Sequence, residues 1–407
     1  MNFEHSSEVK DLIGRLEAFL DAHVYPLEKA HRAWTTREDT MWKKWPEMES
    51  LKEKAKAAGL WNLFLPREYG PLSPGLTNLA YAPLAERMGR VLWCSEVFNC
   101  SAPDTGNMEV LAKYGTPEQQ KAWLRPLLDG SIRSAFLMTE PQVASSDATN
   151  IETSITADGD EYLINGHKWW SSGALHEHCD IFIVMGKTDP TAERHQQQSM
   201  ILVPRATPGV QVMGPLRAMG LWDGPGGHGE VKLNQVRVPK NNLLLGEGRG
   251  FEIAQGRLGP GRIHHCMRLI GMAQRSLELM CQRSTERATY GKKLRDYSSI
   301  RQEVAQSRCE IEQARLLTLA AADRMDQLGN KGAKELISMI KIVTPGMTQK
   351  VVDRAMQIFG GAGINDRLPL HDFFAWARIL RLADGPDEVH MYQLGRNTID
   401  RYAQKHS

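Results

Sequence analysis

Two changes in the spacing of apolar residues divide the 407-residue chain into three segments. Residues 1–133 and 248–407 carry apolar side chains three and four positions apart, which is the spacing of amphipathic helices. Residues 134–247 instead hold short β-prone runs separated by turn pairs such as Asn165-Gly166. These spacings predict an α+β protein with an N-terminal helical domain (1–133), a middle antiparallel β-barrel or sandwich domain (134–247) and a C-terminal four-helix bundle domain (248–407).

The first helical segment also carries a start signal and a stop signal. Thr116-Pro117-Glu118-Gln119 predicts a helix start, because Thr116 can cap the first turn and Gln119 can complete a capping box. Gly130 then predicts the helix end.

The C-terminal segment is expected to form four helices, over roughly residues 251–283, 298–328, 333–359 and 386–403. Pro345 falls inside the third of them. A proline within a helix removes one backbone hydrogen bond and clashes with the preceding turn. We therefore expect a kink or a break at Pro345.

Composition excludes several classes of protein. Charged residues make up 24% and apolar residues 42% of the chain, as in soluble globular proteins. The formal net charge of +2 provides no field for gripping nucleic acid. No apolar run is long enough to span a bilayer, and the polar, acidic N-terminus resembles neither a secretory signal nor a transit peptide. We expect a cytoplasmic protein without a membrane span or a nucleic acid partner, although an organelle matrix stays open.

The cysteines and histidines give no metal signature. The six cysteines are scattered without a CxxC pair, so we expect reduced and mostly buried thiols. The run from His176 to Cys179 lacks a second ligand group at a recognisable spacing, and His264-His265 is a weak companion. No metal site is expected.

The segment from Phe136 to Glu152 has the strongest chemical content. Thr139, Ser145 and Ser146 place hydroxyls and backbone amides at a turn that follows a strand-like run. Such a turn can donate hydrogen bonds to a ring system lying across the strand end, although an ordinary serine-rich turn has the same composition. The sequence has neither a Walker A loop nor a Rossmann glycine pattern, so a dinucleotide must be bound in another way.

A series of ordered motifs carries a resemblance to a known family. The motifs are FLMTEPQVASSD at 136–147, NGHKWWSSG at 165–173, GRGFEIAQGRLGPGR at 248–262, RATYGKKL at 287–294, EIEQAR at 310–315 and QIFGGAGI at 357–364. In this order they resemble the acyl-CoA dehydrogenase family, from YGTPEQQ at 114–120 to ADGPDE at 383–388. Within that family the chain is similar to the dehydrogenase portion of the group formed by family members 10 and 11.

The resemblance implies that the middle domain holds the flavin ring of FAD. Thr139 matches the residue whose hydroxyl and amide contact the flavin near N5, and Trp170 matches the tryptophan that flanks the ring. One of Trp169 and Trp170 also suits core packing. Ser146 matches a serine near the acyl-CoA, but the stretch before it is one residue longer than usual, so Ser145 and Ser146 remain interchangeable. The implied cofactor contacts in this domain are Phe136, Met138, Thr139, Ser145, Trp170, Ser171 and Ser172.

The C-terminal segment is implied to bind the rest of the cofactor and the substrate. Arg287, Gln357 and Gly361 match positions that reach the FAD of a neighbouring subunit, and a guanidinium suits its pyrophosphate because the planar fork binds two oxygens. A helix-ending glycine cluster is the alternative for Gly361. Arg262 matches an arginine near the CoA moiety, with a surface salt bridge as the alternative. Because the family completes its FAD site across a subunit boundary, the resemblance implies a homodimer or a homotetramer.

The resemblance also implies a catalytic base. The family uses a carboxylate, usually glutamate, in a Tyr-Glu-Gly-Thr stretch, and Asp384 stands at that position in Ala-Asp-Gly-Pro. Burial is expected to raise its pKa above the ordinary value of about 3.9. Some family members place the base directly before the arginine that matches Arg262, but Gly261 cannot take a proton. Glu388 matches a glutamine near the flavin, and Pro386 replaces a threonine that contacts it.

The function implied is FAD-dependent dehydrogenation of a fatty acyl-CoA thioester to the trans-2-enoyl-CoA, as in fatty acid β-oxidation, with electron-transfer flavoprotein as the acceptor. Asp384 removes the α-proton while the β-hydrogen leaves as hydride to flavin N5. An acyl-CoA oxidase or a flavin monooxygenase on the same fold is the alternative enzyme. A non-catalytic flavin or acyl-CoA binding protein is the alternative if the short side chain of Asp384 cannot reach the α-carbon.

Overall fold

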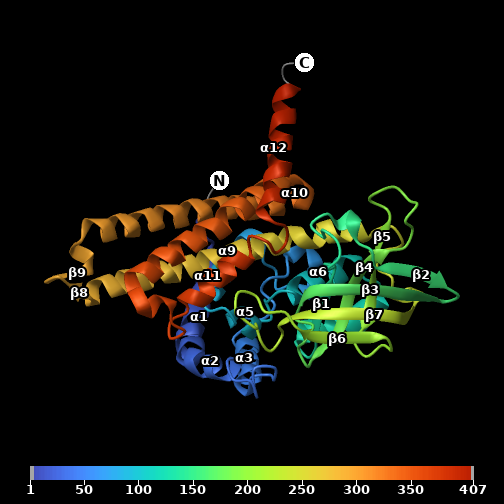
Figure 1. Ribbon diagram of the computed structural model, residues 1–407, viewed down its shortest axis with the longest axis horizontal. Coiled ribbons are helices and arrows are strands. Elements are labelled where there is room, and N and C mark those ends of the chain that lie inside the picture. Colours follow the sequence, from blue (N-terminus) through green and yellow to red (C-terminus); the bar gives the residue numbers. More distant parts are fainter. Residues whose placement is uncertain (1–3, 405–407) are drawn as a thin grey trace. The chain divides into compact units, whose positions relative to one another are not determined.

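The computed structural model describes residues 4–404, which form two compact units (Figure 1). Unit 1 combines the described chain up to Asp21 with Leu76–Ser95 and the chain from Gly259 onward. Unit 2 combines Ala22–Gly75 with Glu96–Leu258. Each unit is therefore assembled from segments that lie far apart in the sequence. Across the described residues, no helix has both the length and the apolar character needed to cross a bilayer.

Unit 2 is built on a mixed sheet of seven strands, counted over the described residues. The strands are β1 (Arg133–Leu137), β2 (Ser154–Asp158), β3 (Glu161–Ser172), β4 (Cys179–Lys187), β5 (Gln198–Pro204), β6 (Val210–Pro215) and β7 (His228–Pro239). Their order is β1-β4-β2-β3-β7-β6, with β5 paired to β4. The β2–β3, β3–β7, β4–β5 and β6–β7 pairs are antiparallel, whereas β1–β4 and the short β2–β4 pair are parallel. The predicted middle β domain is confirmed, and the parallel pairs correct its expected all-antiparallel arrangement.

The core of unit 2 lies around β4, which pairs with β1, β2 and β5. All side chains from Ile181 to Met185 of β4 are fully buried, as are those of the facing run Met200–Val203 of β5. Continuous apolar runs of this kind belong to strands that are covered on both faces. Strand β1 therefore rests against the most rigid part of the sheet, and the segment after it begins from a fixed point.

Helices of the N-terminal segment complete unit 2. They are α2 (Glu28–Thr35), α3 (Pro46–Ala57), α6 (Asp104–Tyr114), α7 (Pro117–Gln119) and α8 (Arg125–Asp129), with the short α5 (Cys94–Val97) at the change from one unit to the other. The predicted capping box is present, because the Gln119 amide donates to Thr116 Oγ1 (3.3 Å) and the Thr116 amide donates to Gln119 Oε1 (2.9 Å). Gly130 ends α8 with a φ of 74°, as expected from its sequence position.

Unit 1 is helical apart from one short hairpin. Its elements are α1 (Ser7–Phe19), α4 (Asn78–Met88), most of α9 (Gly250–Glu286), β8 (Ala288–Thr289), β9 (Lys292–Lys293), α10 (Ser298–Phe359), α11 (Leu370–Ile379) and α12 (Asp387–Ala403). Figure 1 shows the β8–β9 hairpin at one end of long helices that run side by side. The predicted helices 251–283 and 386–403 correspond to α9 and α12, whereas α11 is an additional helix that the sequence analysis did not predict.

Helix α10 is interrupted at Gly329 and not at Pro345. Gly329 has non-helical dihedral angles (φ 65°, ψ −175°), between the predicted helices 298–328 and 333–359. The break predicted at Pro345 is wrong, because that residue lies inside a continuous helical run. Pro345 and Val351 are buried along this helix. Their packing offsets the cost of a proline inside a helix, about 3 kcal/mol.

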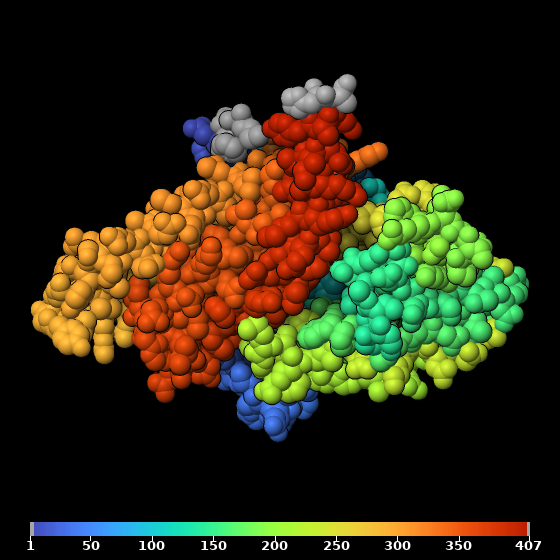
Figure 2. Space-filling view, turned by 45° about the horizontal axis from the view of Figure 1, so that its top comes forward, coloured from blue at the N-terminus to red at the C-terminus, as the bar shows by residue number. Residues whose placement is uncertain are grey.

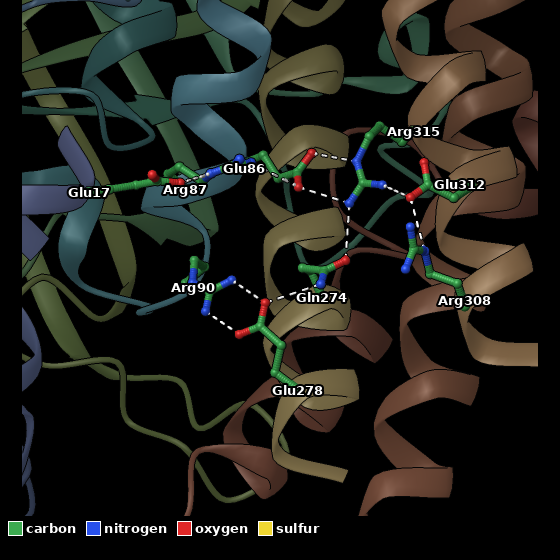
Figure 3. A network of polar contacts seen from close by, with 9 residues as sticks. All are labelled: Glu17, Glu86, Arg87, Arg90, Gln274, Glu278, Arg308, Glu312 and Arg315. Atoms are coloured by element: carbon green, nitrogen blue, oxygen red, sulfur yellow. Dashed lines mark hydrogen bonds and ion pairs between the residues drawn. The ribbon is translucent and has the colours of Figure 1, made fainter. Parts of the chain in front are cut away.

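A network of polar contacts joins α1, α4, α9 and α10 of unit 1 (Figure 3). Arg315 of α10 donates two hydrogen bonds to the Glu86 carboxylate of α4 (2.9 and 3.0 Å). Arg90, two residues after the end of α4, binds both oxygens of the Glu278 carboxylate of α9, with one of the two hydrogen bonds at 2.9 Å. A guanidinium that binds both oxygens of a carboxylate fixes direction as well as distance. The network therefore fixes α4, α9 and α10 against one another.

Candidate active site

A buried lysine fixes the chain that follows β1. Lys168 of β3 donates from Nζ to the Met138 carbonyl (3.0 Å), to Glu140 Oε1 (2.8 Å) and to a carbonyl of β4 (2.7 Å). The Trp169 amide donates to the Thr139 carbonyl (3.0 Å). Hydrogen bonds thus hold the chain at Met138, at Thr139 and at Glu140.

The charges of this fixing pair balance each other. The side chain of Lys168 is 0% exposed and that of Glu140 is 2% exposed. Burial lowers the pKa of Lys168 to about 8, and the Glu140 carboxylate opposes that fall. Burial alone would raise the pKa of Glu140, but Lys168 and the Thr153 hydroxyl hold it below its ordinary value. Both groups are therefore ionised at neutral pH, and each charge neutralises the other.

A β-bulge places an exposed aromatic ring next to this segment. The pairing of β3 with β7 shifts between Lys168 and Ser171, and Trp170 has a φ of 52° there. Trp170 is 40% exposed, whereas Ser171 is buried. Ser172 Oγ lies 2.9 Å from His228 Nδ1, and the His228 and Trp170 rings are 5.6 Å apart. The exposed indole offers a flat apolar surface beside His228.

The turn after Glu140 distinguishes the two candidate serines. Ser145 Oγ accepts from the Glu140 amide (2.8 Å) and donates to the Val143 carbonyl (3.2 Å). Its hydroxyl therefore closes the turn itself. Ser146 is exposed. The geometry favours Ser146 over Ser145 as the serine that contacts a ligand.

The ring of Phe136 is covered on one side by an arginine that the sequence analysis did not select. The Arg257 guanidinium lies 4.0 Å from the ring centroid, and its Nε donates to Asn107 Oδ1 (3.0 Å). Stacking of this kind combines cation–π attraction with coverage of the ring by the guanidinium plane. One face of the Phe136 ring is therefore covered by Arg257.

Asp384 lies on a strained turn that several helices fasten. Its φ is 56°, a left-handed value that aspartate adopts at low cost compared with most residues. Arg262 Nε of α9 donates to the Asp384 carbonyl (2.8 Å), and His390 Nε2 of α12 lies 3.4 Å from the same oxygen. Lys341 Nζ of α10 donates to the carbonyls of Leu380 (2.6 Å) and of Ala383 (2.7 Å) directly before Asp384. The turn is held from α9, α10 and α12.

The carboxylate of Asp384 extends over a glycine of α9. The side chain is 19% exposed, and Oδ2 lies 3.4 Å from His265 Nε2. A Cβ atom built on Gly261 would lie 3.6 Å from Asp384 Oδ2. The missing side chain at Gly261 leaves room beside the carboxylate.

Burial shapes the electrostatics of this turn. Burial lowers the pKa of Arg262 and of Lys341, and in both the Asp384 carboxylate opposes the fall. Burial also lowers the pKa of His390 to about 4, so this imidazole is neutral at pH 7. The cations at the turn are therefore Arg262 and Lys341, and both favour a negative charge on Asp384.

The residues implied in pyrophosphate binding lie at one end of unit 1. Arg287 begins the β8–β9 hairpin and Gln357 precedes the end of α10; both are exposed. Arg283, one turn before Arg287, stacks on the Phe359 ring (5.3 Å to the centroid), so the ends of α9 and α10 lie together. A Cβ at Gly361 would meet nothing within 4 Å. The first turn of α12 holds Glu388, which is also exposed.

The histidine cluster of the sequence does not form a metal site. His176 and His178 have ring centroids 5.7 Å apart, and burial lowers the pKa of His176 to about 3. Over residues 4–404, no group of three or more His, Cys, Asp or Glu side chains is arranged to hold a metal ion.

Family models match along most of the chain. The acyl-CoA dehydrogenase N-terminal domain matches residues 6–131, the middle domain matches residues 135–236 and the C-terminal domain matches residues 248–399. The chain belongs to the acyl-CoA dehydrogenase family.

Comparisons with individual proteins show which members of the family the chain is similar to. The chain is 58% identical over 397 residues to acyl-CoA dehydrogenase family member 10 of Mus musculus, an alignment that covers 96% of this chain and 37% of the mouse protein. It is 53% identical over 399 residues to family member 11 of Gallus gallus, which covers 97% of this chain and 51% of that protein. The chain thus spans about half or less of the length of these relatives. The solved structure of a Mycobacterium abscessus protein is similar with a TM-score of 0.94 at 50% identity, over 98% of this chain and 100% of that one.

Proposed function

We propose that the chain is an FAD-dependent acyl-CoA dehydrogenase that oxidises a fatty acyl-CoA thioester to the trans-2-enoyl-CoA, with Asp384 as the base. The observation that carries the proposal is the turn at Asp384. Its main chain is fastened from three helices, while its carboxylate remains 19% exposed over Gly261. The nearby cations keep the carboxylate ionised. A partly exposed carboxylate on a turn held in place can be within reach of a substrate proton.

The chain's own residues supply binding, orientation and proton transfer. The α-proton of a thioester is weakly acidic, so negative charge develops on the thioester oxygen as the proton leaves. FAD, when bound, supplies the acceptor for the β-hydrogen as hydride. Asp384 takes the α-proton, and its turn need not rearrange because Arg262 and Lys341 already bind main-chain carbonyls around it.

The flavin ring is assigned to the segment around Thr139 and Trp170. A planar ring can stack on the exposed Trp170 indole while the fixed main chain at Thr139 offers hydrogen bonds to its edge. Support is weaker for Ser171, which is buried, and for Ser145, which bonds within its own turn. The proposed cofactor contacts are Phe136, Met138, Thr139, Ser145, Trp170, Ser171, Ser172, Arg287, Gln357, Gly361 and Glu388.

The proposed partners are an acyl-CoA substrate, contacted by Ser146 and Arg262, electron-transfer flavoprotein, and a second copy of the chain in a homodimer or homotetramer. Two features of unit 1 support self-association. Arg287 is exposed at the end of the helices. Helix α12 lies on the surface of unit 1 (Figure 2) and exposes Met391 (51%), Tyr392 (71%) and Ile399 (69%). Apolar side chains exposed in this number on one helix mark an association surface.

We also propose the domain limits 1–133, 134–247 and 248–407. They agree with the change of element type, because α8 ends at Asp129 and β1 begins at Arg133. At the second limit β7 ends at Pro239 and α9 begins at Gly250.

Anaerobic mixing with a panel of acyl-CoA esters tests the proposal. The purified protein should be yellow with about one FAD per chain, and at least one ester should bleach the flavin absorbance. Asp384→Asn should keep flavin and ligand but lose about 10²- to 10⁴-fold in turnover, the usual contribution of a general base. Asp400→Asn, an exposed aspartate of α12, is the matched control. Comparable turnover in Asp384→Asn would move the base elsewhere, and a flavin that no ester bleaches would indicate a binding protein.

A further inference from the structure

Four side chains of unit 2 form a line of hydrogen bonds that leads to the ring of Phe136. Arg257 Nε donates to Asn107 Oδ1 (3.0 Å), and Asn107 Nδ2 donates to Ser134 Oγ (2.9 Å). Ser134 Oγ in turn donates to Asp104 Oδ1 (2.6 Å). Asn107 is 0%, Ser134 1% and Asp104 2% exposed. Because Arg257 covers one face of the Phe136 ring, the line joins that ring to the beginning of its own strand, β1.

The donor and the acceptor of each bond follow from the residue types. A guanidinium has donors only and a carboxylate has acceptors only, so Asn107 accepts from Arg257 and Ser134 donates to Asp104. The hydroxyl of Ser134 then has no hydrogen left for Asn107 and accepts from its amide nitrogen. Turning the amide around would place its NH₂ group against Arg257 Nε and break both bonds. Position 107 therefore requires a side chain that accepts and donates at once.

We propose that Asn107 is a positioning residue for FAD: it holds the guanidinium of Arg257 over the Phe136 ring and, through Ser134, ties that guanidinium to the beginning of β1. This inference rests on the proposed function, in which Phe136 contacts the flavin. Asn107 itself need not touch the cofactor. It acts on the orientation of the ring relative to the strand that carries it.

The ring of Phe136 benefits from such a hold because its own torsion is broad. The χ2 torsion of phenylalanine has only a loose two-fold preference, so the strand sets the position of Cβ and not the plane of the ring. The Arg257 guanidinium lies 4.0 Å from the ring centroid, and a planar group stacked on a ring limits its rotation. A free arginine side chain has many rotamers. The hydrogen bond to Asn107 is one of the contacts that keep the guanidinium over the ring.

Helix α6 leaves room for the guanidinium directly before Asn107. A Cβ atom built on Gly106 would lie 3.2 Å from both Cζ and Nε of Arg257, which is closer than an ordinary van der Waals contact. The guanidinium therefore packs against the backbone of α6 at a residue without a side chain. A larger residue at position 106 would push Arg257 away from Asn107 or from the ring of Phe136.

Charges of alternating sign anchor the other end of the line. Arg133 Nε donates to Asp104 Oδ2, and Arg133 Nη1 lies 2.5 Å from Glu96 Oε1. Lys52 Nζ lies 3.2 Å from the same oxygen of Glu96. Burial alone would raise the pKa of Glu96, but Arg133 and Lys52 hold it below its ordinary value. Asp104 is therefore held from the side opposite to the ring, and the line starts from a fixed point.

The first test measures the rate at which FAD leaves the FAD-loaded protein, followed by the fluorescence of released flavin. Asn107→Leu removes both bonds of the amide, so the rate should rise about 10- to 100-fold, the range expected for loss of a hydrogen bond to a charged group. Gln119→Leu is the matched control, because this buried amide donates to the carbonyls of Asn241 and Leu243. The control should unfold more easily and release FAD as the parent does. An Asn107→Leu protein with the release rate of the parent overturns the inference.

The second test examines the path from Asn107 to the ring. Arg257→Lys keeps the positive charge but has no planar face to cover Phe136, so it should also raise the rate of FAD release about tenfold or more. Combined with Asn107→Leu it should add less than about twofold, because both changes act through the same stacked pair. Fully additive losses overturn the inference. Arg257→Lys leaves the bond between Asn107 and Ser134 in place, so it is informative even where Asn107→Leu does not fold.

The third test observes the ring itself. In FAD-loaded protein labelled with 3-fluorophenylalanine, the signal of Phe136 is assigned by its absence in Phe136→Leu. It should consist of two separate ¹⁹F resonances, because a covered ring turns over slowly. The two should merge into one averaged resonance in Asn107→Leu and stay separate in Gln119→Leu. Separate resonances in Asn107→Leu would show that the ring is held without the amide, which overturns the inference.

Failure of the inference and failure of the proposed function have different signatures. If Asn107→Leu releases FAD as the parent does while acyl-CoA esters still bleach the flavin, the positioning role is wrong and the proposed function stands. If Phe136→Leu keeps the release rate of the parent, the ring does not contact the flavin and the inference fails with that contact alone. If the parent binds no FAD, or no ester bleaches it, the proposed function itself is wrong.

Discussion

The two segments that carry the proposed chemistry are fixed in opposite ways. In unit 2 the main chain at Thr139 is held by Lys168 and Glu140, buried charges of opposite sign that balance each other. In unit 1 the turn at Asp384 is held by Arg262 and Lys341, two cations that bind uncharged carbonyl oxygens. In the first arrangement the two charges neutralise each other. In the second, positive charge lies beside the Asp384 carboxylate.

The difference follows from what each segment has to do. The segment at Thr139 has to present backbone and hydroxyl groups at fixed positions, and a balanced ion pair does this without creating a local field. Asp384 has to stay ionised in a partly buried place until it takes a proton. Cations close to the carboxylate favour that state. If this difference holds, loss of the Lys168–Glu140 ion pair should mainly reduce stability. Loss of a cation at the Asp384 turn should mainly reduce turnover.

Lys168→Met should have the largest effect on stability. It leaves the Glu140 carboxylate buried without its cation, which costs about 3–5 kcal/mol. Chemical denaturation should show this loss, and FAD retention should fall with it because the chain at Met138 and Thr139 loses its anchor. Lys232→Met, an exposed lysine of the neighbouring strand β7, is the control. A stable Lys168→Met protein that retains FAD would contradict the structural role of the pair.

Glu109→Gln should change how the stability of the chain depends on pH. Burial raises the pKa of Glu109 to about 8, so the folded carboxyl stays neutral where the unfolded one ionises. The parent should therefore lose stability as pH rises from about 4.5 to 8, on the order of 4–5 kcal/mol at about 1.4 kcal/mol per unit. The glutamine variant should lack this loss. Urea unfolding at pH 5 and pH 8 compares them, and equal slopes for the two proteins would refute the assignment.

Lys341→Met should divide stability from turnover. Lys341 donates hydrogen bonds to two carbonyl oxygens, so its loss should cost about 1.5–3 kcal/mol, less than the loss of Lys168. Turnover should fall more than tenfold, because the turn before Asp384 loses an anchor and the carboxylate loses a cation. Lys350→Met, an exposed lysine of the same helix, serves as the control. A normal kcat in Lys341→Met would show that Lys341 has only a structural role.

Gly261→Ala should have the smallest effect. The new methyl group would lie 3.6 Å from Asp384 Oδ2, an ordinary contact distance. Alanine replaces glycine within α9, which should stabilise the helix by up to about 1 kcal/mol. Thermal unfolding should show a slightly higher Tm, with kcat changed less than about threefold. A large loss of activity would mean that the carboxylate moves over Gly261 during the reaction.

Local patterns predicted most of the fold. The helical, β and helical segments follow from apolar spacing, and the capping box at Thr116 and the stop at Gly130 follow from residue type. Helix α11 was missed because its ten residues, which include Phe373 and Trp376, are few for a helical spacing to be recognised. The break expected at Pro345 was wrong because tertiary packing can hold a proline inside a helix, whereas glycine at 329 defines the real interruption.

The candidate site was predicted in part. Contiguous motifs pointed to Thr139 and Trp170, which β1 and β3 bring close through the hydrogen bond from Trp169 to Thr139. Apart from Arg262, which was selected for a different contact, the residues that fix these segments were not selected. Lys341 lies more than forty positions from Asp384 in sequence, and His265 lies more than a hundred positions away. Contacts at such separations are made by helix packing, which no local spacing encodes.

The space beside Gly261 also bears on how the base could change place during evolution. An acidic side chain added at 261 would have to occupy the volume that the Asp384 carboxylate now fills. A chain carrying both acids would bring two like charges into contact, and each would hinder the other. Transfer of the base between the turn at 384 and helix α9 therefore requires a coupled pair of substitutions, since either single intermediate has one acid too many or none. Such epistasis would tend to keep a lineage with the base it already has.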